Sequence, residues 1–184
     1  MTSRSVNATA MSLLGFLHEG PMTGWNLVAA VTRQIGDFWS VTQSQVYREL
    51  STMADLGLIR AGKLGPRDRR PYSITRAGRK VFREWLATNP GPETIRFPLL
   101  LTVLFGKHLP PGRLGEFVED HRKAHEQRRD EYAGLVEAIE SATGDEPPDP
   151  YIEATVRFGL AYETTVLDWF DSLPPALIGR PEQP

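Results

Sequence analysis

The stretch TQSQVYRELSTMADLGLI, residues 42–59, limits the possible folds of this chain more than any other feature. Thr42 and Gln45 stand three residues apart, as the two members of a capping box do, so a helix is predicted to begin here. Apolar residues then recur at helical spacing on one side, and a glycine follows where the helix should end. The residues that fill these roles are Val46, Leu50 and Met53 on the core side, and Gly57 at the end.

The opposite side of this predicted helix is polar, and a second helix precedes it. Thr23 is a good N-cap for a helix that ends at Gly36, with Leu27, Val31 and Ile35 repeating every four residues. Two helices joined by a short turn, the second with a polar outer face, form a helix-turn-helix pattern. That outer face carries Ser44, Arg48, Ser51 and Asp55, with Tyr47 on its flank and Gln43 in its exposed first turn.

A basic hairpin is predicted directly after the second helix. LIRAG and PYSIT are short strand-like runs, and the segment KLGPRDRR joins them. A hairpin in this position makes the pattern a winged helix-turn-helix. A further helix is predicted to begin near Thr75, with Val81, Phe82, Trp85 and Leu86 on one face.

The chemistry of this outer surface suits DNA. Glutamine can pair with adenine and arginine with guanine in the major groove, while arginines on a hairpin tip can reach the phosphate backbone. A polar helix face or a charged loop taken singly is more often ordinary solvent-exposed surface, but the combination within about 35 residues favours DNA binding. The predicted DNA-contacting residues are Thr42, Gln43, Ser44, Tyr47, Arg48, Lys63, Arg67, Arg69 and Arg70.

Charge divides the chain into two halves at the segment TNPGPE, which reads as a linker. Residues 1–92 hold 12 basic and 6 acidic side chains, a net charge of +6, whereas residues 93–184 hold 9 and 17, a net charge of −8. Only the first half is therefore expected to meet a polyanion. We predict a DNA-binding domain over 1–92 and a helical dimerisation domain over 93–184.

The second half is predicted to be helical throughout, so the fold class is mainly α with a small β-hairpin wing. A short apolar helix is expected near 95–107 and a long charged one near 111–141. A last helix should begin with Asp149 and Pro150 and end near Ser172. That last helix is apolar nearly all round, which predicts that it is buried.

The long charged helix carries a heptad-like row of residues that needs a partner. A second copy of the chain, the last helix or the N-terminal helix could cover it. A second copy is favoured, because a two-fold protein matches DNA half-sites about 34 Å apart. The predicted dimer contacts are Leu114, Val118, His121, His125, Tyr132, Leu135 and Ile139, with Arg128 in the same row. His121 and His125 have metal-ligand spacing, but no third ligand is evident and no metal or cofactor is predicted.

Other function classes find little support. The chain has no cysteine, which excludes disulfides and thiol chemistry, and no P-loop, nucleophile elbow or dinucleotide glycine pattern, so no enzyme is predicted. Its longest apolar run, FPLLLTVLF, is too short for a membrane span. Near the N-terminus Ala10, Leu13, Leu14 and Leu17 have helical spacing, so we interpret that segment as an amphipathic helix of a cytoplasmic protein, not a signal peptide.

Three segments resemble the winged-helix core of the PadR family of bacterial transcriptional regulators: LLGFLHEGPMTGWNL, FWSVTQSQVYRELSTMADLGLI and RRPYSITRAGRKVFREWL. RFPLLLTVLFGKHL and RFGLAYETTVLDWF resemble the shorter helical C-terminal domain of that family. The resemblance implies a homodimer, usually a repressor, that leaves a pseudo-palindromic operator when an effector binds. The alternative is a winged-helix protein-interaction module that does not bind DNA.

Aromatic residues could line an effector cavity, although most aromatic side chains in a protein this size belong to its ordinary core. We expect at least one tryptophan to face a small-molecule ligand. The candidates for such a pocket are Trp39, Trp85, Phe97 and Trp169.

Overall fold

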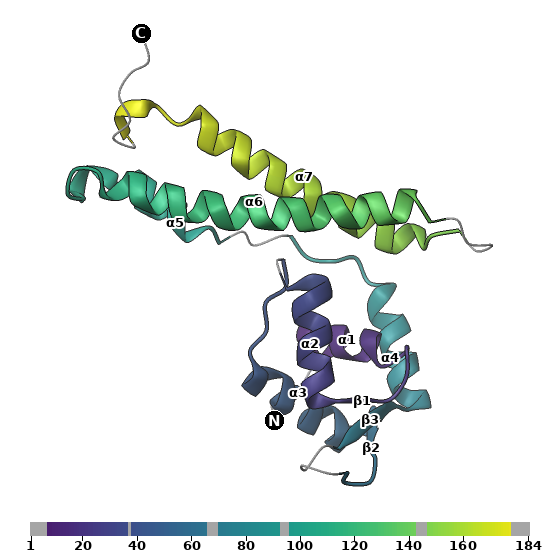
Figure 1. The fold of residues 1–184 in the computed structure, drawn as a ribbon. Helices are drawn as coiled ribbons and strands as arrows, with labels where there is room; N and C mark the ends of the chain where they lie inside the picture. Colours follow the sequence, from purple (N-terminus) through teal and green to yellow (C-terminus); the bar gives the residue numbers. More distant parts are fainter. Residues whose placement is uncertain (1–6, 37, 66–69, 93–95, 143–146, 178–184) are drawn as a thin grey trace. The chain divides into compact units, whose positions relative to one another are not determined.

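The computed structural model describes residues 7–36, 38–65, 70–92, 96–142 and 147–177. The chain forms two compact units, Met1–Pro92 and Glu93–Pro184 (Figure 1). Each unit has a hydrophobic core of its own.

The N-terminal unit is a winged helix-turn-helix. Asn7, Thr23, Thr42 and Thr75 each cap a helix by accepting a backbone N–H, as the preference for short polar side chains at this position predicts. The first helix ends at Phe16, and Leu17, the last member of its predicted apolar set, is its C-cap. The elements are α1 (Ala8–Phe16), β1 (Met22–Thr23), α2 (Gly24–Ile35), α3 (Gln43–Asp55), β2 (Ile59–Ala61), β3 (Pro71–Ile74) and α4 (Arg76–Leu86).

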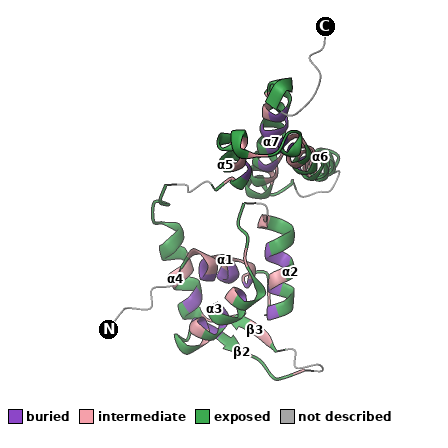
Figure 2. Cartoon of the chain, turned by 90° about the vertical axis from the view of Figure 1, so that its left-hand side faces the viewer, coloured by how far each residue is buried: buried purple, intermediate pink, exposed green. Residues whose placement is uncertain are grey.

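The core of this unit forms where α1, α2 and α3 meet. Figure 2 shows buried residues on all three helices. α1 contributes the i, i+3, i+4, i+7 set that the sequence predicts, and α3 contributes its predicted apolar side. The buried residues of these helices include Ala10, Leu13, Leu14, Leu17, Leu27, Val31, Val46, Leu50 and Met53.

The sheet has three strands in the order β1-β3-β2, all antiparallel to their neighbours. The predicted hairpin pairs Ile59 with Ile74 and Ala61 with Tyr72. The additional strand β1, only two residues long, pairs Met22 with Tyr72. No sequence pattern predicts β1, because two residues are too few for an alternating pattern to appear.

Thr75 joins the end of α3 to the start of α4. Its hydroxyl donates to the carbonyls of Gly57 (2.8 Å) and Leu58 (3.0 Å) and accepts the Gly78 N–H (3.1 Å). A Cβ on Gly78 would lie 2.2 Å from the Leu58 carbonyl oxygen, so only glycine permits this packing. Gly57 has a φ of +69°, the left-handed conformation that ends α3. α4 is thereby fixed against the base of the hairpin.

The C-terminal unit is built on an antiparallel pair of long helices (Figure 1). Asp149 caps the second of them by accepting the Tyr151 N–H at 2.8 Å, with Pro150 at the first helical position as predicted. The elements are α5 (Pro98–Leu104), η2 (Gly106–His108), α6 (Arg113–Glu140), α7 (Pro150–Ser172) and η3 (Pro175–Leu177).

The prediction that α7 is buried all round is wrong. One face packs on α6 and α5 through Val166, Leu167 and Phe170, but the opposite face is open in the single chain. Tyr151 is 83% exposed and Phe158 59% exposed. Apolar composition alone could not distinguish burial within the chain from an apolar surface left for another partner.

Candidate nucleic-acid interface

The first turn of α3 presents polar side chains outward. The Thr42 N–H donates to Gln45 Oε1 (2.8 Å) and the Gln45 N–H donates to Thr42 Oγ1 (3.2 Å), which completes the predicted capping box. Thr42 and Gln45 are therefore engaged in holding the helix terminus. Gln43 and Ser44 are exposed, next to N–H groups at the positive end of the helix dipole.

Tyr47 lies where α3 meets the start of α2. Its ring packs so closely on Gly24 that a Cβ there would lie 2.6 Å from the Tyr47 Cε1 atom. The side chain nevertheless remains 43% exposed. The ring is thus held by the preceding helix while one side stays accessible to a partner.

Arg48 is exposed next to a buried acid that the sequence analysis did not identify. Glu49 is 7% exposed and accepts a hydrogen bond from Asn7 Nδ2 at 3.0 Å. Arg48 Nε lies 3.6 Å from the same carboxylate oxygen, Glu49 Oε1. Asn7 also caps α1 by accepting the Ala10 N–H at 2.9 Å. One signal could have identified Glu49: it falls among Val46, Leu50 and Met53 on the core side of the helix.

The hairpin beside α3 brings further cations to this unit. Lys63 and Arg70 are exposed at the two ends of its loop, and Arg67 and Arg69 lie outside the described residues. The Gly62 N–H donates to the Pro71 carbonyl at 2.7 Å and extends the pairing beyond β2. α3 contacts β2 directly, so the polar helix face and the hairpin belong to one rigid unit (Figure 1).

The predicted row of dimer contacts on α6 divides into two sets. Leu114 and Val118 are buried in the core shared with α7 of the same chain, and Tyr132 packs on Gly159 of α7. α7 was one of the partners that the sequence left open. His121 and Leu135 are exposed, and Ile139 is half-buried.

His125, the last member of that row, takes part in a buried polar cluster. Its Nδ1 bonds Glu163 Oε2, and Arg128 Nε donates to Glu163 Oε1 at 2.9 Å. Phe97 and Phe170 flank the imidazole, with ring centroids 6.0 and 5.6 Å away. The cluster links α6 to α7 within the chain. The Nδ1 of His121 instead bonds the Phe117 carbonyl oxygen at 2.9 Å.

The four predicted effector contacts are divided between the two units. Trp39 and Trp85 belong to the N-terminal unit, where each is about two-fifths exposed. Phe97 and Trp169 belong to the C-terminal unit, where their ring centroids lie 5.8 Å apart beside its core.

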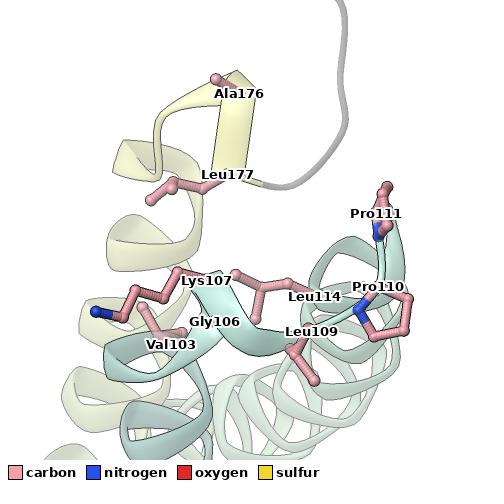
Figure 3. A pocket seen from close by; sticks show the side chains of 10 residues that line it. Val103, Gly106, Lys107, Leu109, Pro110, Pro111, Leu114, Ala176 and Leu177 are labelled. Carbon is pink, nitrogen blue, oxygen red and sulfur yellow. The ribbon is translucent and has the colours of Figure 1, made fainter.

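A cavity of 360 Å³ lies elsewhere in the C-terminal unit, between η2 and η3. Figure 3 shows Leu177 on one side of it and Lys107 and Leu114 on another. None of the four predicted aromatic residues lines it. In the part of the chain that the structure describes, no helix is both long and apolar enough to cross a membrane.

Two family models match the chain in succession. The Transcriptional regulator PadR-like family matches residues 13–84, which include the whole helix-turn-helix and hairpin, and the Virulence activator alpha C-term family matches residues 95–177. The chain belongs to the PadR-like family. Members of this family are transcriptional regulators, so the chain is a regulator and not an enzyme.

Known proteins of the PadR-like family extend this match over most of the chain. The negative transcriptional regulator PadR of Bacillus subtilis is 25% identical over 171 residues, which cover 88% of this chain and 93% of the relative. A crystal structure of that protein with operator DNA has a TM-score of 0.75 at 23% identity, covering 91% and 97% of the two chains. A crystal structure of it with p-coumaric acid has a TM-score of 0.65 at 23% identity, covering 91% and 94%.

Proposed function

We propose that this PadR-like regulator binds a specific operator through α3 and the β2–β3 hairpin. One observation carries the proposal: Ser44 and Arg48 are exposed on the face of α3 opposite its buried residues, and Gln43 is exposed in its first turn. The N-terminal half of a recognition helix is the part that reaches base edges in the major groove. The Bacillus subtilis relative in complex with operator DNA supports the same use of the fold.

The residues divide into those that read bases and those that position the protein. Gln43 suits adenine and Arg48 suits guanine, since each can make two hydrogen bonds to the major-groove edge of its base. Tyr47, held against Gly24, offers the exposed part of its side chain beside them. Lys63 and Arg70 of the hairpin would contact phosphates and add affinity without sequence information.

We propose that a second copy of the chain covers the exposed face of α7. Tyr151, Phe158 and Tyr162 follow one another at helical spacing, and the Phe158 and Tyr162 rings stack with centroids 6.4 Å apart. Leu101 and Leu104 of α5 are 62% and 70% exposed in the same unit. A large exposed apolar area of this kind marks a protein interface. The dimer contacts are therefore proposed on α7 and α5, and not at the residues of α6 that are buried within the chain. Leu135 and His121 of α6 are exposed and can add to them.

Regulation by a small molecule is part of the proposal. The Bacillus subtilis relative is named a negative regulator, and it has been crystallised with p-coumaric acid. We therefore infer that this protein represses transcription and that an effector lowers its affinity for the operator. Trp39, Trp85, Phe97 and Trp169 remain the candidate contacts, and quenching of tryptophan fluorescence by aromatic acids tests them.

A repressor must reach the chromosome, so we place the protein in the cytoplasm. Its operator is expected to be pseudo-palindromic, because the two-fold axis of a dimer presents two α3 helices to half-sites about one DNA turn apart. No metal or cofactor enters this function.

The test first selects the fragment of sheared genomic DNA that the parent protein binds most strongly. It then compares binding of that fragment by Tyr47→Ala, Arg48→Ala and the parent protein. Each lost base contact should weaken binding by ~1–3 kcal/mol, roughly 5- to 150-fold, while the protein stays folded. Arg33→Ala, which removes an exposed arginine from the last turn of α2, is the matched control. Unchanged affinity in both α3 variants would contradict operator reading by α3, whereas a parent protein that enriches no fragment would support the protein-interaction alternative.

A further inference from the structure

A second basic surface lies on α4, outside the helix and hairpin assigned to the operator. Arg76, Arg79, Lys80 and Arg83 are all exposed. At 100° per residue the four side chains lie within an arc of about 100°, and they extend over ~10 Å along the helix axis. We refer to these four residues as the α4 basic face.

Packing fixes the direction of the α4 basic face. Gly78 is buried against Leu58, and Val81 and Phe82 pack on the core of the N-terminal unit from the opposite side of the helix. Phe82 also stacks on Trp85, with centroids 6.4 Å apart. The cations therefore cannot turn inward.

The charge of this face is unbalanced, which separates it from an ordinary solvated surface. Among the described residues, Glu84 is the acidic partner of Lys80 (3.7 Å), and Arg76, Arg79 and Arg83 have no acidic partner. The exposed side of α6 differs, because its cations alternate with acids: Lys123 pairs with Glu119 at 3.7 Å. Solubility alone requires charge of either sign, whereas four cations and one acid favour a polyanion.

The α4 basic face continues from the base of the hairpin. Thr75, the residue before Arg76, is hydrogen-bonded to the carbonyls of Gly57 and Leu58 at the end of α3. Arg60 of β2 is exposed and lies opposite Ser73 of β3 in the sheet register, adding a cation between hairpin loop and helix. Cations thus follow one another from the hairpin onto α4.

We propose that the α4 basic face binds the phosphate backbone of the DNA that flanks each operator half-site, on the same duplex. This inference rests on the proposed operator binding and extends it. Arginine and lysine at this spacing can neutralise neighbouring phosphates without reading bases, so the contact adds affinity that depends on duplex length and salt. Each neutralised phosphate contributes about 0.9 to the slope of log K against log salt concentration.

The test uses two duplexes with the same selected operator: one ends at the half-sites, and the other continues for about 15 base pairs on each side, roughly 50 Å. The dimer should bind the long duplex about tenfold or more tightly than the short one at low salt, with a steeper salt slope. Changing Arg76, Arg79, Lys80 and Arg83 together to Gln should remove that difference and leave short-duplex binding nearly unchanged. Circular dichroism checks the fold of the variant.

A matched control removes Lys63 and Arg70 from the hairpin by the same substitution. It should weaken binding to both duplexes and preserve the ratio between them. Equal affinity of the parent protein for the two duplexes, or a loss in the α4 variant that is the same on both, would overturn the inference. Absence of binding by the parent protein to either duplex would instead contradict the proposed operator binding itself.

Discussion

The ring of Tyr47 on α3 lies against the backbone of Gly24 on α2. The two helices therefore pack through an aromatic ring and a glycine at this point. A methyl group on Gly24 would approach the Tyr47 Cε1 and Cζ atoms to 2.6 and 2.8 Å. The contact sets the direction of a half-exposed aromatic side chain beside Gln43 and Arg48. The packing at the start of α2 therefore affects the surface of α3 that we assign to DNA.

Gly24→Ala should weaken operator binding by about tenfold, ~1.4 kcal/mol, because Tyr47 must move to accommodate the new methyl group. Fluorescence anisotropy with the enriched duplex measures the effect. Gly91→Ala serves as the control, since a Cβ there meets nothing within 4 Å. Parent-like affinity of Gly24→Ala would mean that the position of Tyr47 does not matter for DNA.

Asn7 should stabilise the N-terminal unit in two separable ways. Asn7→Ala loses the cap of α1 and the bond to Glu49, and should lower the free energy of unfolding by ~1–3 kcal/mol. Asn7→Ser keeps a capping oxygen and loses only the contact with the buried carboxylate, so its loss should be smaller. Urea unfolding followed by circular dichroism measures both, and equal losses would assign the whole effect to Glu49.

The helix-turn-helix could be predicted from sequence because its signals are local. The capping box at Thr42 and the period of Val46, Leu50 and Met53 are set within a few residues, and the structure confirms both. The strand β1 and the contact of Gly24 with Tyr47 depend on tertiary packing, so no short-range pattern reports them. The same limit applies to the long helices, where apolar residues on α6 and α7 do not reveal which partner covers them.

Two glycines on the long helices give a matched comparison in the C-terminal unit. A Cβ on Gly159 would lie 2.4 Å from the Tyr132 ring, whereas one on Gly134 would meet nothing within 4 Å. Gly159→Ala should destabilise the protein by ~1–3 kcal/mol through overpacking. Gly134→Ala should stabilise it by up to ~1 kcal/mol through helix propensity. Thermal unfolding measures both, and stabilisation by Gly159→Ala would show that α6 and α7 are not so closely packed there.

Two single variants, each with one charge on a different long helix, locate the dimer surface. Phe158→Asp puts a carboxylate in the exposed apolar face of α7 and should shift the protein from dimer to monomer. Leu135→Asp, on the row of α6 that the sequence favoured, should have a smaller effect. Sedimentation velocity at micromolar concentration distinguishes the two species. If Leu135→Asp were monomeric and Phe158→Asp dimeric, the interface would lie on α6 and not on α7.

Binding to genomic DNA tests the central claim most directly. Sheared DNA from the source organism is incubated with the protein, and the most enriched fragment is compared with a scrambled duplex by fluorescence anisotropy over a salt series. We predict a preference of about 10³-fold or more that weakens steeply with salt and falls roughly 5- to 150-fold in Arg48→Ala. No enriched fragment, and no binding even at about 50 mM salt, would contradict operator recognition by α3 and the hairpin.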